Sequence, residues 1–166
     1  MSEFSILVKK DWEHFFSIVN TEEAWIIPLL SAVDSVTYEQ AFWRPGGQVA
    51  SIADIMMHAT GWLESTLRGV LGMPELDNED WPEPPAPSEA AWSEMVARLK
   101  ATVLDLSRAL HNLSLEELYS TPTGRETKRS TMITDILVHN AYHAGQIVKL
   151  RQAHDALETA GLAATA

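Results

Sequence analysis

The chain has 166 residues, which suits one domain with a single hydrophobic core but not two. It carries 23 acidic and 12 basic residues, for a net charge of −11, and contains no cysteine. The charge argues against a duplex nucleic-acid binder and against docking on anionic lipid. The missing thiols exclude disulfides, thiolate metal sites and cysteine nucleophiles. No apolar run approaches the roughly 18 residues that span a bilayer, and the N-terminal segment is not typical of a secretory signal. We therefore expect a single domain over 1–166 in the cytoplasm, without nucleic-acid or membrane partners.

The first predicted helix runs from Glu3 to about Val19, where apolar residues recur at helical spacing. A second helical stretch is predicted from Glu22 to about Val36. Pro28 lies inside it, so we expect a kink or a first-turn proline there. We interpret the two stretches as one broken helical unit, which ends before a turn at residues 44–48 (RPGGQ).

The next helix is predicted to begin after Ser51, with Asp54 as its capping-box partner, and to end at about Leu71 before Gly72. Residues 73–87 are acidic and hold five prolines, so they form a long irregular connection. This connection is either a solvated crossover or a lid in which Trp81 covers a pocket. The composition favours the crossover.

The third long helix is predicted from Ser88, its N-cap, to about Leu110. A turn-rich segment with a short helix at Leu115–Leu118 follows, and the last helix runs from about Thr131 to Leu157. No segment alternates with a period of two, so no sheet is expected. The sequence predicts an all-α four-helix bundle with a long proline-rich connection between its second and third long helices.

Two heptapeptides in this pattern are related. Residues 52–58 (IADIMMH) and 133–139 (ITDILVH) are identical at four of seven positions, which indicates related halves of a pseudo-symmetric bundle. On a helical wheel, the histidine that ends each heptapeptide lies at the edge of the apolar stripe rather than at its centre. When two such helices pack together, the edges of their stripes meet at the border of the core, where a polar cluster can be partly buried.

His58 and His139 end the two heptapeptides, and His143 follows His139 by four residues. Residues at that spacing lie one turn apart on the same helix face, with Cβ atoms about 6 Å apart, and can chelate one divalent ion. Three neutral imidazoles favour zinc, nickel, iron(II) or manganese over calcium or magnesium. Three protein ligands leave coordination positions open, as in catalytic sites. The alternative is three unconnected histidines on helix surfaces or in the core.

Four further residues are candidates for the pocket or for contacts to the ligand histidines. Asp54 and Asp135 precede a histidine by one turn and could orient an imidazole or act as a base. Helix capping is the simpler interpretation of both, and we prefer it. Trp62 and Gln146 follow the histidines by about one turn and could line a metal pocket, or Trp62 could belong to the core.

The histidines and their surroundings resemble a known family. The pattern is an I-x-x-I-x-x-H helix after a W-R-P turn, a long loop containing Trp81 and Pro82, and the segment HNAYHAGQI at 139–147. It is similar to the DinB/YfiT-like superfamily. The resemblance implies a four-helix bundle in up-down-down-up order, a bound metal (most often nickel or zinc) at the residues matching His58, His139 and His143, and a homodimer.

Members of that superfamily transfer low-molecular-weight thiols, or are described as metal-dependent hydrolases or damage-inducible proteins. We therefore expect a metal-dependent enzyme that activates water or a low-molecular-weight thiol toward a small-molecule substrate, as a hydrolase or a thiol-S-transferase. Its catalytic residues are not assigned. Arg44, Arg68 and Arg125 are candidates to bind carboxylates of such a thiol. The alternatives are a non-catalytic metal-binding protein of stress or damage responses, and a helical dimerisation protein without metal.

Overall fold

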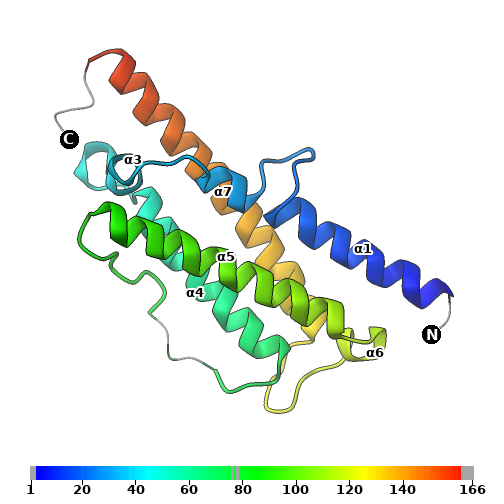
Figure 1. The fold of residues 1–166 in the computed structure, drawn as a ribbon. Helices are drawn as coiled ribbons and strands as arrows, with labels where there is room; N and C mark the ends of the chain where they lie inside the picture. Colours follow the sequence, from blue (N-terminus) through cyan, green and yellow to red (C-terminus); the bar gives the residue numbers. More distant parts are fainter. Residues whose placement is uncertain (1–2, 76, 78, 162–166) are drawn as a thin grey trace.

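The computed structural model describes residues 3–75, 77 and 79–161, and every regular element among them is helical. Figure 1 shows a bundle of long helices joined by short ones. The long helices are α1 (Glu3–Asn20), α4 (Ile52–Val70), α5 (Glu89–Asn112) and α7 (Arg129–Thr159). The short ones are α2 (Leu29–Val33), α3 (Tyr38–Phe42), a 3-10 turn η1 (Pro45–Gly47) and α6 (Leu115–Leu118). The predicted all-α bundle is confirmed.

The directions of the long helices explain the long connection. In Figure 1, α1 and α7 run one way and α4 and α5 run the other way, which gives the up-down-down-up order. Helix α4 packs against both α5 and α7. Because α4 and α5 are parallel neighbours, the chain between them has to return along the length of the bundle. Residues 73–87 make this crossover.

The predicted capping signals set the ends of these helices. The Asp54 amide donates to Ser51 Oγ (3.2 Å), and the Ser51 amide donates to Asp54 Oδ2 (2.7 Å), which completes the capping box at the start of α4. Gly72, with φ of +69°, follows the end of α4 in the left-handed conformation that glycine tolerates. Ser88 Oγ accepts from the Ala91 amide (3.1 Å) at the start of α5.

One part of the core lies along the facing stripes of α4 and α7, where the related heptapeptides pack, and buried residues of α1, α2 and α5 complete the core. Three of the four equivalent apolar positions of the heptapeptides are buried in both copies (Ile52 and Ile133, Ile55 and Ile136, Met56 and Leu137). Burial of these aliphatic side chains drives the two helices together and fixes their rotation. The histidine at the end of each heptapeptide is thereby turned toward the other helix. No helix in the described part of the chain is long and apolar enough to cross a bilayer.

The predicted helix at 22–36 is wrong. Residues 21–28 are irregular, Trp25 is fully exposed, and Pro28 is the N-cap of a helix that covers only Leu29–Val33. Proline disfavours helical geometry in the residue before it, so the chain cannot run helically into α2. Ser35 then adopts a φ of +60°, and Thr37 starts α3 with a capping box of its own. Local turn and cap chemistry outweighed the apolar periodicity here.

Candidate metal centre

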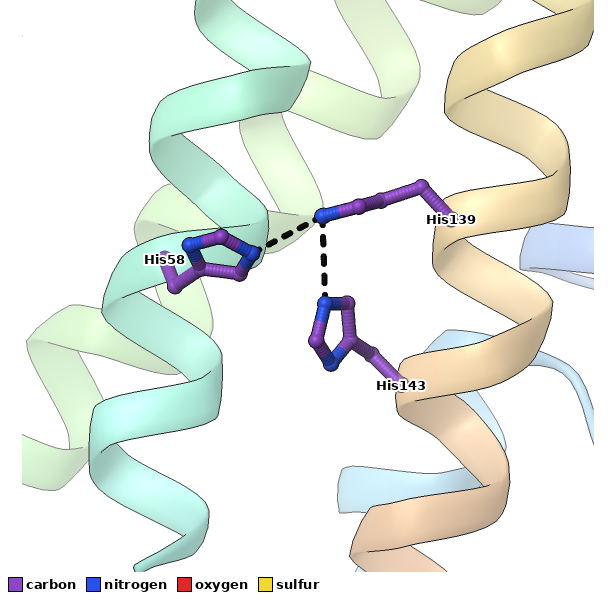
Figure 2. Close-up of side chains that lie close together, drawn as sticks. All are labelled: His58, His139 and His143. Carbon is purple, nitrogen blue, oxygen red and sulfur yellow. Dashed lines mark hydrogen bonds between the residues drawn. The ribbon is translucent and has the colours of Figure 1, made fainter. Parts of the chain in front are cut away.

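The three histidines converge between α4 and α7 (Figure 2). Nε2 of His58, from α4, lies 2.9 Å from Nε2 of His139, from α7. Nε2 of His143, one turn further along α7, lies 3.1 Å from the same atom. One ligand atom from each residue lies within 4.8 Å of the others. The packing of the two stripes therefore brings together the three residues that the spacing singled out.

Burial keeps the two imidazoles of α7 neutral. His143 is 3% exposed, and His139 is half-buried. Burial, followed by the neighbouring charge of His139, lowers the pKa of His143 to about 4. Burial and then the charge of His58 also lower the pKa of His139. At neutral pH the two rings on α7 are unprotonated, which is the form that binds metal.

Hydrogen bonds fix which nitrogen of two rings faces the centre. Nδ1 of His58 donates to the backbone carbonyl of Asp80 (2.7 Å), and Nδ1 of His143 donates to Oε1 of Gln146 (2.7 Å). Carbonyl oxygens can only accept, so each Nδ1 carries the hydrogen and each Nε2 keeps its lone pair. Acceptors on the outer nitrogens of this kind hold metal-binding histidines in place.

The connection between α4 and α5 covers the centre. The Trp81 ring stacks on His58, with centroids 3.9 Å apart and planes 7° apart. The Trp62 indole donates to Oδ1 of Asp80 (2.8 Å), and that oxygen lies 3.3 Å from Nδ1 of His58. The described residues of this connection are mostly exposed, which agrees with the solvated crossover, and Trp81 covers the His58 ring rather than a pocket.

Two cavities reach the histidines from the side of Trp62. One, of about 790 Å³, extends to His139 and is bordered by Asp135, and the other, of about 320 Å³, extends to His58. The charged residues on the wall of the larger cavity are Glu75, Arg125, Glu126 and Asp135. Carboxylates thus outnumber basic groups beside the histidines.

The other residues that the sequence offered for the site lie either at a helix end or near the cavities and the histidines. Asp54 belongs to the capping box and pairs with Arg44 (2.7 Å), as the preferred interpretation held. For Asp135 that interpretation is wrong, because α7 begins at Arg129 and Asp135 is its seventh residue, on the cavity wall with His139. Trp62 lies on both cavity walls, and Gln146 contacts His143.

Sequence reasoning missed Asp80, whose main contact to His58 is a backbone carbonyl without a side-chain signature. The arginines proposed as carboxylate receptors are engaged elsewhere. Arg125 pairs with Glu75 and donates to the Met73 carbonyl (2.9 Å), and Arg68 donates to the Pro74 carbonyl (3.0 Å). These contacts hold the connection between α4 and α5 rather than leaving free guanidinium groups.

The donor atoms fit a divalent ion. His58 and His143 both direct an Nε2 lone pair at Nε2 of His139, which can carry at most one hydrogen. A hydrogen on Nε2 of His139 can bridge only one of the two contacts, and in the other contact two lone pairs face each other. A cation between the rings accepts a lone pair from all three Nε2 atoms. Tetrahedral zinc with bonds of 2.0–2.1 Å would place such nitrogens about 3.3 Å apart, a few tenths of an ångström from the observed separations. Nδ1 of His139 is buried without a hydrogen-bond partner in the described structure.

The sequence comparison decides the family. The DinB superfamily matches residues 28–147, a range that includes all three histidines and the covering connection. The chain belongs to the DinB superfamily. Comparisons with curated proteins and with solved structures gave no significant match.

Proposed function

We propose that this DinB superfamily protein binds one divalent transition metal ion through His58, His139 and His143 and uses it to activate water or a small thiol. The convergence of three Nε2 atoms, two of them with fixed tautomers, carries the proposal. An ion bound there would lower the pKa of a water or thiol in its open position, which supplies a nucleophile at neutral pH. The imidazole set favours zinc or nickel, with iron(II) or manganese as the next candidates.

The surroundings of the triad support a catalytic role over a purely structural one. Structural sites are closed by four protein ligands, whereas this cluster offers three and adjoins a cavity of about 790 Å³. Helices α4 and α7 are also held together by buried aliphatic side chains of the core, independently of any ion. The bundle therefore has a source of stability besides a metal bridge.

The cavity wall indicates which substrates suit the site. Asp135 and Glu126 form no ion pair with any residue in the described part of the chain, and the guanidinium of Arg125 is already paired with Glu75. A negative wall disfavours a substrate rich in carboxylates and favours a neutral or amine-bearing one. The Asp135 carboxylate is also placed to take up a proton released by a nucleophile in the cavity.

The test begins with metal quantification on protein prepared with zinc, nickel, iron(II) and manganese in turn. The reconstituted protein is then screened for hydrolysis of small esters and for transfer of thiols to an electrophile. We expect one tightly bound ion per chain and faster reaction of cysteamine than of mercaptoacetate. The absence of a stoichiometric metal under these conditions would leave the helical dimerisation protein as the better description.

Metal removal separates the enzyme from the non-catalytic alternative. We expect chelation to abolish turnover while lowering the melting temperature by only a few degrees. A drop of tens of degrees, together with no turnover of any thiol or ester, would favour the non-catalytic metal-binding protein of stress responses. The homodimer that the resemblance implies stays a prediction for sedimentation analysis.

A further inference from the structure

A second cluster of potential ligand atoms lies near the C-terminal end of α7. It consists of His154, Asp155 and Glu158, whose ligand atoms lie within 4.8 Å of one another. Nδ1 of His154 is 4.0 Å from Oδ1 of Asp155 and 4.0 Å from Oε2 of Glu158. His154 and Glu158 are four residues apart, the helical spacing at which two side chains reach one ion.

His154 itself is the unusual member of this cluster. It is only 5% exposed, and its Nδ1 is buried without a hydrogen-bond partner in the described structure. Its ring and the Trp43 ring form a T-shaped pair, with centroids 5.3 Å apart and planes 81° apart. A buried polar nitrogen without a partner costs free energy, so a ligand that supplies the partner would be stabilised.

The two carboxylates lack a basic side chain that would neutralise them. Within the described residues, His154 is the only basic group within 4.0 Å of either one. Arg151, one turn earlier on α7, directs its guanidinium to the carbonyl of Ala32 (2.9 Å) instead. Gln40 of α3 donates to Oδ1 of Asp155 (2.8 Å) and so holds that carboxylate beside the histidine.

We propose that His154, Asp155 and Glu158 form a second divalent-cation site, weaker than the triad, which takes zinc or a similar ion. One imidazole and two carboxylates are a donor set of zinc and manganese sites. Both carboxylates have side chains 60% exposed, so an ion can reach them from solvent beside Nδ1. His154 lies eleven positions after His143 on the same helix, about 16 Å along the axis, so each site holds its own ion.

The test is a zinc titration of the full chain against a chromophoric competitor. The wild type is expected to bind two equivalents with different affinities, and His139→Ala to keep the weaker one. Glu158→Gln should weaken that equivalent at least tenfold while leaving the tighter one unchanged. Glu94→Gln, which alters an exposed acid of α5, is the matched control and should retain both.

The imidazole resonance of His154 distinguishes an ion from a proton as the missing partner. We expect the ring ¹⁵N signals to shift with the weaker zinc equivalent in the wild type and to remain in place in Glu158→Gln. If His154 is only a protonated partner of the two carboxylates, zinc will not move its resonance at neutral pH and the proposal fails. Equal zinc binding by Glu158→Gln and Glu94→Gln would also overturn it.

Discussion

Helix α7 carries two histidine clusters that differ in how they are built. His139 and His143 meet His58 across a helix interface, and the outer nitrogens of two of these three rings are held by carbonyls of the crossover and of α7. The cluster at His154 takes all three of its ligand atoms from five consecutive residues of one helix, and both of its carboxylates are exposed. Preorganised ligands lose less freedom on binding, so tertiary convergence is expected to give the tighter site.

Removal of a ligand histidine from the triad should have the largest effect on the difference in metal affinity between the two clusters. His139→Ala and His143→Ala should each weaken the tight metal equivalent by more than about 100-fold, because a remaining pair of imidazoles is a poor chelate. Competitive metal titration measures the effect. The control is His14→Ala, on the exposed face of α1. Equal metal retention in the three variants would contradict the assignment of His139 and His143 as metal ligands, and the triad would then not be the tighter site.

The hydrogen bond from His143 to Gln146 tests the preorganisation itself. Gln146→Leu removes the acceptor of Nδ1 without removing a proposed ligand, so the ring can rotate or change tautomer. Loss of such an acceptor typically costs about 10–100-fold in metal affinity. Gln152→Leu, at an exposed position of the same helix, is the control and should bind metal as the wild type does. Identical affinities in both variants would show that ring orientation has no influence here.

The pH dependence of stability in the metal-free protein should report the burial of His143. The pKa of His143 is lowered to about 4 in the folded chain, against about 6.5 when unfolded. The unfolded chain therefore binds more protons between these values, and stability is lost as the pH falls from about 6.5 toward 4. We expect a loss of roughly 1–3 kcal/mol in urea unfolding.

The His143→Asn variant isolates this contribution, because the rest of the chain still titrates in it. Its stability should fall less steeply than that of the wild type over the same pH range. Parallel curves for the two proteins would show that His143 is not held neutral by burial.

The stacking of Trp81 on His58 should have the smallest effect. Trp81→Ala removes the indole that covers one face of the His58 ring but leaves the Asp80 carbonyl that fixes the His58 tautomer. The metal affinity should therefore fall only several-fold, about 1 kcal/mol. Trp25→Ala changes a fully exposed tryptophan and should have no effect. If Trp81→Ala weakens binding as much as the loss of a histidine does, the crossover contributes more than a cover.

Apolar periodicity and side-chain caps act within a few residues, so the helical class, the long helices and the capping residues could be predicted from the amino-acid sequence. The repeated heptapeptide and the four-residue spacing also singled out all three histidines of the triad. His58 and His139 lie at the same position beside the apolar stripe of their helices, so packing of the two stripes is expected to bring them together. The same periodicity failed at 22–36, where Pro28 and the cap at Thr37 act locally against it.

The surroundings of the histidines could not be predicted in this way, because they depend on how distant segments pack. The Asp80 carbonyl beside His58 and the stacked Trp81 depend on the path of a crossover whose composition indicates no more than an irregular connection. The place of Asp135 on a cavity wall depended on where α7 begins, two residues before the predicted start. Backbone acceptors and loop paths are set by the packing of distant segments, and no short-range pattern in a sequence encodes them.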